Sequence, residues 1–106
     1  MRMWMLPSNL LCSVHLCAEH YEIHKAAGCI RNNRTNWHTN LANNGYLELH
    51  NLGSRHNELA AEMVARGYKH RSPLVQPDVG VLGKVDVARS VKDLTARCSA
   101  CASRVV

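Results

Sequence analysis

HLCAEHYEIHKAAG, residues 15–28, places apolar and polar side chains on opposite faces of one helix. The apolar positions in and around it recur every three or four residues, or at multiples of that spacing, and they are Cys12, Leu16, Ile23, Ala27 and Ile30. This spacing predicts a helix over residues 8–30, with Ser8 or Asn9 as its N-cap. The long amphipathic segment therefore favours a fold built from packed helices.

Two further helices are predicted by their end signals and spacing. GSRHNELAAEMVARG, residues 53–67, offers Ser54 as an N-cap and Gly67 for a left-handed C-terminal turn. Residues 85–100 carry apolar side chains at intervals of four, three and four, namely Val87, Val91, Leu94 and Cys98. The Asn-rich stretch 31–45 is expected to be loop with one short turn at 37–41. The stretch 70–80, with two prolines and a glycine, is expected to be a connector.

Length and composition limit the architecture. The chain has 106 residues, 46% of them hydrophobic and none of them Phe, so its core must come from aliphatic side chains. We expect an all-α fold, with one domain spanning residues 1–106 and built from three main helices joined by long loops. The apolar start, residues 1–12, is short and interrupted by Pro7, and is read as neither a signal peptide nor a membrane span.

Charge and cysteine content suggest a partner and a compartment. Thirteen Lys and Arg residues against eight Asp and Glu give a formal charge of +5, and a basic surface suits a polyanion such as nucleic acid. Five cysteines form an odd number without a secretory signal, which favours reduced thiols in the cytoplasm.

The polar face of the first predicted helix carries His15, Glu19 and Glu22, and it has three readings. A solvated surface is the usual one, because charged residues normally lie outside. A metal site is a second, since His20 and His24 are four residues apart, although two histidines make only half of a zinc site. They also lie on a different flank of the helix from Glu22.

The third reading comes from two sequence blocks. The pattern His-Leu-x-Ala-Glu-x-x-Glu occurs over residues 15–22, and Arg-x-x-Glu-Leu-x-Ala-Glu-x-x-x-Arg-Gly-Tyr occurs over residues 55–68. The two blocks, and the order in which they occur, resemble the pyrimidine-dimer DNA glycosylase family, whose best-known member is a bacteriophage enzyme. The resemblance covers roughly residues 1–70. It implies a small helical DNA-repair enzyme that acts as a glycosylase and AP lyase.

The family resemblance also implies catalytic residues. The nucleophile of the family is the main-chain α-amine of the first mature residue. An ungapped register on Glu22 places Met1 at that position. Met1 should also be retained in the mature protein, because a bulky Arg2 should block removal of the methionine. α-Amines ordinarily have a pKa of about 7.7–8.0, so a useful fraction is neutral at physiological pH. The family's essential acid falls on Glu22. No cofactor is implied for catalysis, because the amine itself supplies the covalent chemistry.

The resemblance further implies a DNA-binding surface. We expect Arg2, His15, Lys25 and Arg66 to contact damaged double-stranded DNA, with Lys25 placed one helical turn beyond the active site. The family's arginines beside the motif glutamate are replaced by Tyr21 and Lys25, and neither reproduces a bidentate phosphate clamp. The family's aromatic, lysine-rich tail is also replaced, here by RCSACASRVV. These departures bear on the choice of lesion more than on the chemistry.

That different tail suggests a structural metal. Cys98 and Cys101 form a Cys-x-x-Cys pair, and Cys12 with His15 has complementary spacing. Together they could hold zinc and pin the last helix to the first, although Cys98 also fits the apolar stripe of its own helix. Such a site would compete with the active site for His15.

The preferred interpretation is thus a monomeric glycosylase and AP lyase in the cytoplasm of a bacterium or a phage-infected cell. Its substrates would be pyrimidine dimers or abasic sites, reached through an imine on the N-terminal amine. A non-catalytic nucleic-acid-binding module on the same scaffold is the main alternative. A zinc-stabilised interaction protein is a third. Borohydride trapping on damaged DNA separates the first reading from the other two, because only an imine-forming enzyme becomes covalently attached.

Overall fold

Helix α1, Ser13–Arg31, is the longest element of the computed structural model, which describes residues 1–105. The other α-helices are α2, Asn36–Asn43, α3, Leu52–Ala65, α4, Val87–Arg97, and α5, Ser99–Val105, with short 3-10 turns at Ser8–Leu10 and Leu49–Asn51. Residues 1–105 contain no strand, so the all-helical class is confirmed. The described part of the chain has five α-helices, where the sequence predicted three main ones.

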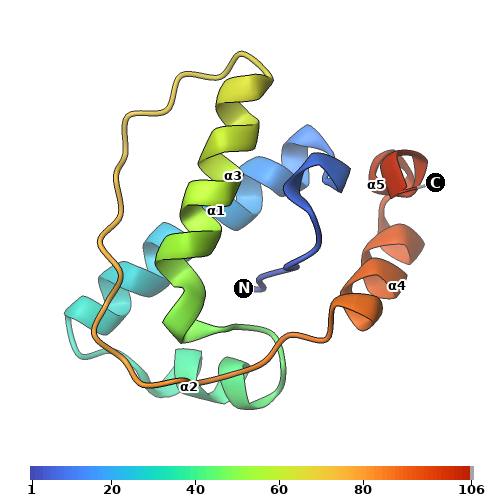
Figure 1. The fold of residues 1–106 in the computed structure, drawn as a ribbon. Coiled ribbons are helices and arrows are strands. Elements are labelled where there is room, and N and C mark those ends of the chain that lie inside the picture. The colour runs from blue at the N-terminus through green and yellow to red at the C-terminus, as the bar shows by residue number, and fades with distance from the viewer. Residues whose placement is uncertain (106) are drawn as a thin grey trace.

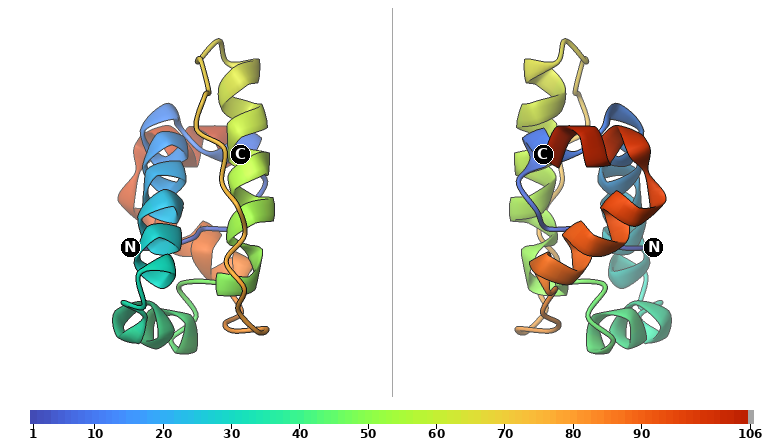
Figure 2. Two further views of the ribbon diagram at one scale, coloured as in Figure 1. Left: turned by 90° about the vertical axis from the view of Figure 1, so that its left-hand side faces the viewer. Right: turned by 90° about the vertical axis from the view of Figure 1, so that its right-hand side faces the viewer.

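The N-terminal segment, residues 1–7, runs between the helices rather than around them. Figure 1 shows it in the space between α3 and α4, while α1 passes behind α3. Helices α4 and α5 lie on one side of the molecule, and the long connector of residues 66–86 runs along the opposite side (Figure 2). The first residues of the chain are therefore enclosed by elements from both ends of the sequence.

The core draws on the N-terminal segment as well as on the helices. Met3 and Leu6 are fully buried, together with the predicted apolar stripe of α1, which is Cys12, Leu16, Ile23, Ala27 and Ile30. Each fully buried aliphatic side chain contributes about 1.5–3 kcal/mol relative to an exposed one. The stripe predicted for the last helix is only partly correct, because Leu94 is buried whereas Val87 is exposed.

Several helix boundaries differ from their predicted positions. Helix α1 begins at Ser13 rather than near Ser8, because the Cys12 sulfur accepts the hydrogen bond of the His15 N–H and caps the helix. Helix α3 begins at Leu52, two residues before Ser54, which was the predicted N-cap. The added first residues, Leu52 and Gly53, are both buried. The helix ends as expected, with Gly67 in a left-handed conformation (φ 93°).

The C-terminal and central segments also depart from expectation. The single helix predicted over residues 85–100 is divided at Cys98, whose backbone is extended (φ −134°, ψ 109°). The short turn predicted at 37–41 is the two-turn helix α2. The connector predicted at 70–80 is confirmed to have no helix or strand. Farther along, at Gly83, it passes so close to Leu47 that a Cβ would lie 2.0 Å from the Leu47 carbonyl oxygen. No helix within residues 1–105 is long and apolar enough to cross a lipid bilayer.

Candidate active site and metal-ligand clusters

Glu22 lies against the first residues of the chain. Its side chain projects from α1, and Oε2 accepts a hydrogen bond of 2.9 Å from the main-chain N–H of Arg2. Only three covalent bonds separate that nitrogen from the α-amine of Met1, so the amine lies within about 4 Å of it. The structure therefore brings together Met1 and Glu22, the two residues that the family resemblance implies for catalysis.

The side chain of Arg2 anchors this N-terminal segment. Its Nη2 donates to Asp93 Oδ2 at 2.9 Å, and its guanidinium lies 4.2 Å from the Trp4 ring centroid and 5.1 Å from that of Tyr46. The Met3 N–H donates to the Tyr46 carbonyl at 2.8 Å. The hydrogen bond from Arg2 holds the pKa of Asp93 below its usual value. Because Arg2 is both stacked and ion-paired, it keeps a defined position, and this restricts the position of Met1.

Glu19 occupies the buried side of α1, one turn before Glu22. Its two carboxylate oxygens accept from Arg55 Nε at 2.6 Å and Nη2 at 3.0 Å, and both side chains are almost fully buried. Arg55 Nη1 also donates to the Leu6 carbonyl at 2.8 Å and to Glu58 at 3.0 Å. The expectation of a shared polar face with His15 and Glu22 is wrong for Glu19, because Arg55 of α3 takes it into the core.

Burial lowers the pKa of Arg55, but the hydrogen bonds and charges of Glu19 and Glu58 outweigh this effect and raise the pKa above its ordinary value. The guanidinium is therefore a permanent cation. It joins the N-terminal segment, α1 and α3 at one point.

The four residues expected to bind DNA differ in their surroundings. Lys25 is exposed on α1, with its Nζ 5.6 Å from the Tyr21 ring centroid. Arg66 donates to the Leu11 carbonyl at 2.6 Å and to Glu62 at 2.8 Å, so it joins the end of α3 to the start of α1. Arg2 is held by Asp93, as described above, and His15 faces the cysteines. Lys25 is thus the most accessible of the four.

The sulfur cluster, defined as Cys12, His15, Cys98 and Cys101, joins the start of α1 to the junction of α4 and α5. Their ligand atoms all lie within 4.8 Å of one another. The Cys12 and Cys98 sulfurs are 3.9 Å apart, and His15 Nδ1 lies 3.2 Å from Cys12 Sγ and 3.5 Å from Cys101 Sγ. All five cysteines lie within residues 1–105, and none forms a disulfide. The residues predicted to bind zinc are therefore gathered in one place.

Backbone amides surround the sulfur cluster. The N–H groups of Cys12, His15 and Cys101 each point at a sulfur of the cluster, at 3.3–3.4 Å. The Cys101 N–H lowers the pKa of the Cys98 thiol, whereas burial raises the pKa of Cys101 to about 12. His15 lies two helical turns from Glu22, a rise of about 10 Å, so its ring belongs to the sulfur cluster and not to the surroundings of Glu22 and Met1.

The histidine cluster, defined as His20, His24, His56 and His70, lies between α1, α3 and the connector. Its four ligand nitrogens also lie within 4.8 Å of one another. Burial and then the neighbouring imidazoles lower the pKa of His20 to about 4, and the same causes lower that of His24. The spacing of His20 and His24 indicated half of a metal site, but no sequence pattern linked these residues to His56 and His70, which lie over thirty residues further on.

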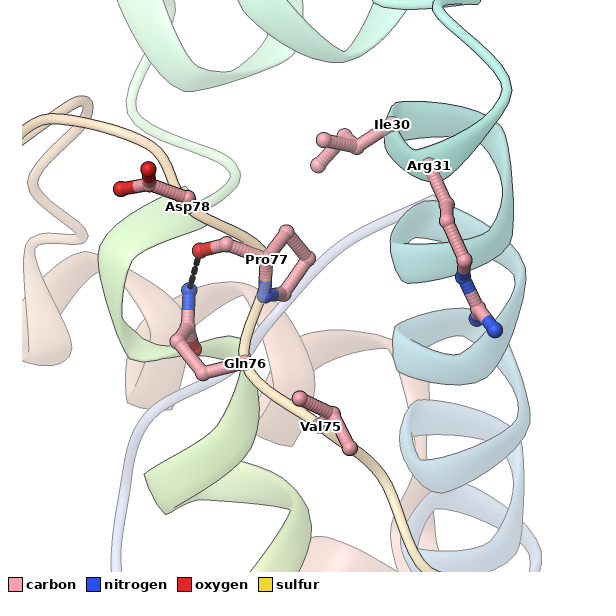
Figure 3. A pocket seen from close by; sticks show the side chains of 6 residues that line it. All are labelled: Ile30, Arg31, Val75, Gln76, Pro77 and Asp78. Atoms are coloured by element: carbon pink, nitrogen blue, oxygen red, sulfur yellow. Dashed lines mark hydrogen bonds between the residues drawn. The ribbon is translucent and has the colours of Figure 1, made fainter.

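A pocket of about 390 Å³ opens between the end of α1 and the connector. It is lined by Ile30, Arg31, Val75, Gln76, Pro77 and Asp78 (Figure 3). Gln76 donates to the Pro77 carbonyl within this wall. Neither Met1 nor Glu22 contributes to its lining, so the pocket is separate from these two residues.

Comparison with known proteins connects this geometry to a family. A family model described as pyrimidine dimer DNA glycosylase matches residues 1–76 of the 106 residues. No curated protein and no solved structure matches the chain. The matched region contains Met1, Glu22 and helices α1–α3, and it ends before α4, so Asp93 and two of the clustered cysteines lie beyond it. On this match, the chain belongs to the pyrimidine dimer DNA glycosylase family.

Proposed function

We propose that the protein is a DNA-repair glycosylase with an associated AP-lyase activity on damaged double-stranded DNA. The observation that supports this most directly is the hydrogen bond from the Arg2 N–H to Glu22, because it places the carboxylate next to the residue that carries the α-amine. A neutral amine is a nucleophile and a nearby carboxylate stabilises positive charge, which are the two groups that imine chemistry on a sugar requires. Membership of a glycosylase family supplies the substrate class.

In the proposed reaction, the Met1 nitrogen attacks C1′ of the damaged nucleotide. A nitrogen–carbon bond forms while the glycosidic bond breaks, and the base leaves with the bonding electron pair. Proton loss from nitrogen and opening of the sugar ring give a protonated imine. Removal of a C2′ proton then expels the 3′-phosphate and cleaves the strand, and water finally releases the sugar and restores the amine. The Glu22 carboxylate stabilises the cationic sugar and the imine, and it assists the proton transfers.

Access to C1′ requires that the damaged nucleotide leave the base stack. This displacement costs a few kcal/mol, and less where the base is damaged or absent. Lys25, exposed one turn beyond Glu22, is placed to meet a backbone phosphate. We assign pyrimidine dimers and abasic sites as the substrates.

Glu22→Gln tests the catalytic assignment. The substitution keeps the size of the side chain and removes the charge opposite the cationic intermediates, so we expect strand cleavage and borohydride trapping to fall by roughly 10²–10³-fold. DNA binding should stay within a few-fold of the parent. Both are measured on duplex DNA that contains one abasic site.

Asp78→Asn is the matched control, because it makes the same chemical change on an exposed carboxylate of the connector. It should cleave like the parent. Cleavage by Glu22→Gln at the parental rate would contradict the assignment of Glu22. Tight DNA binding by the parent without any trapping would instead favour the non-catalytic binding module.

We also propose that the sulfur cluster holds a structural zinc ion. Tetrahedral zinc has Zn–S bonds near 2.3 Å and Zn–N bonds near 2.0–2.1 Å, which place two sulfurs about 3.8 Å apart and a sulfur about 3.6 Å from a nitrogen. The cluster shows 3.9 Å between Cys12 and Cys98, and 3.2 and 3.5 Å from sulfur to His15. The surrounding N–H groups would stabilise thiolate ligands.

Cys98→Ser should lower the zinc content of the purified protein by about one equivalent per chain. It should also remove the thiolate-to-metal charge-transfer absorption of the cobalt-substituted protein, because a hydroxyl is a poor ligand for either ion. Cys29→Ser is the control, since Cys29 is a partly buried thiol outside the cluster. Equal zinc content and equal spectra in the two variants would contradict the proposed site.

A further inference from the structure

The histidine cluster is formed by side chains from three separate elements. His20 and His24 project from the same flank of α1, His56 comes from α3, and His70 comes from the connector. The ring centroids of neighbouring members lie 4.7–5.0 Å apart. Imidazoles that merely pack in a core need not bring their nitrogens together, whereas one ring nitrogen of each of these four lies within 4.8 Å of the others.

The spacing of the nitrogens fits one tetrahedral ion. Zinc–nitrogen bonds of 2.0–2.1 Å place the ligand nitrogens of a tetrahedral site about 3.3–3.4 Å apart. His70 Nε2 lies 3.0 Å from His20 Nε2 and 3.3 Å from His56 Nε2. His24 Nε2 is buried and has no hydrogen-bond partner within the described residues. The cluster therefore offers four nitrogens within 4.8 Å of one another, with two of their separations close to ligand spacing and with one nitrogen otherwise unsatisfied.

The surroundings of His56 allow its Nε2 to face a metal ion. In the ion-free neutral ring, Nε2 can donate to the Ser72 carbonyl oxygen at 2.9 Å, and it also lies 3.3 Å from His70 Nε2. Metal binding through Nε2 would place the ring proton on Nδ1, where the Asn57 side-chain oxygen at 3.0 Å can accept it. Such an outer hydrogen bond to an oxygen is the usual second partner of a metal-bound histidine.

We propose that His20, His24, His56 and His70 bind one divalent first-row transition-metal ion, separate from the sulfur cluster. Neutral imidazole is a good ligand for zinc, copper, nickel and iron, and the all-nitrogen set distinguishes this site from the thiolate site. His20 and His56 are buried, whereas His24 and His70 are partly exposed, so the ion enters from the connector side.

The ion would cross-link three elements. It joins α1 to α3 near the middle of each helix, and it holds the connector at His70, three residues beyond Gly67. The connector also contacts α3 through the Ser72 carbonyl oxygen, which lies 2.9 Å from His56 Nε2, and through the Gln76 side-chain oxygen, which accepts from the Gly53 N–H. Release of His70 would therefore loosen residues 69–75, between the end of α3 and Gln76.

Metal counting on the full-length protein tests the proposal. The parent, loaded with Zn²⁺ and dialysed, should hold about two ions per chain, and His70→Asn and His24→Asn should each hold about one. Both variants should keep the thiolate charge-transfer band of the cobalt form, because the sulfur cluster is intact. His38→Asn removes a buried imidazole outside both clusters and should still hold two ions. Circular dichroism of each variant establishes that it is folded.

Limited trypsin digestion gives a second readout that does not depend on stoichiometry. Lys69 and Arg71 flank His70 and are exposed. At a free Zn²⁺ concentration of ten times the dissociation constant, the opened connector should be about tenfold less populated, and cleavage at these residues about tenfold slower. His70→Asn digested with the same Zn²⁺ should show no protection.

Two results would overturn the proposal. One is a parent protein that holds a single ion, with thiolate absorption and with unchanged content in both histidine variants. The other is digestion at Lys69 and Arg71 that does not respond to Zn²⁺ in folded parent protein. Either would show that the four imidazoles pack together without binding a metal ion. Neither depends on DNA cleavage, so the proposed enzyme activity stands or falls separately.

Discussion

Protein that carries Gly-Ser before Met1 is expected to lose covalent trapping on abasic DNA by at least about 10²-fold while remaining folded. The extension turns the Met1 nitrogen into an amide, which is neither basic nor able to form an imine. It also moves the new amine by about 3.3–3.6 Å per added residue, and near-attack geometry tolerates far less. Trapping with borohydride and denaturing gel electrophoresis measure the effect.

The same two residues added after residue 106 provide the matched control, which should be trapped like the parent. Chemical acetylation of the α-amine should mimic the N-terminal extension. Equal trapping of the parent, extended and acetylated forms would identify an internal amine, such as that of Lys25, as the nucleophile, and the assignment of Met1 would then be wrong.

Arg55→Leu is expected to lower the free energy of unfolding by about 3–5 kcal/mol. The substitution leaves the Glu19 carboxylate buried without its cation, and it removes the donor to the Leu6 carbonyl. Urea unfolding followed by circular dichroism measures the change. The domain is small, so a loss of this size is a large fraction of its total stability.

Two companion variants separate the buried pair from its surroundings. Glu58→Gln removes the exposed partner of Arg55 and should cost no more than about 1 kcal/mol. Arg55→Leu combined with Glu19→Leu should recover most of the loss, because no buried charge remains. A full loss in Glu58→Gln, or none in Arg55→Leu, would show that the ion pair with Glu19 is not what stabilises this junction.

The helical fold was predictable because local signals and burial agree over much of the chain. The apolar stripe of α1 and the glycine that ends α3 follow directly from spacing and backbone preference. The division at Cys98 was not predictable in this way. The apolar spacing of residues 87–98 suits a continuous helix, and the chain turns at Cys98 where its sulfur lies 3.9 Å from that of Cys12, the N-cap of α1.

The candidate site shows the same limit. Met1 and Glu22 could be paired from the family resemblance, and Cys12, Cys98 and Cys101 from metal-ligand spacing. The partner of Arg2 could not, because Asp93 lies 91 residues away and carries no motif. The sequence likewise placed Glu19 on the surface, because a carboxylate on a helix is normally exposed. Glu19 is buried because Arg55, which is distant in sequence, pairs with it. Tertiary contacts, rather than local pattern, decide both cases.

The enclosed position of the N-terminal segment has a consequence for folding. The Arg2 side chain of this segment is anchored by Asp93 of α4, 91 residues further along the chain. Contacts of such sequence separation form slowly, because a long loop must close before they stabilise the fold. We therefore expect the N-terminal segment to reach its final position late in folding, after α1 has packed against α3.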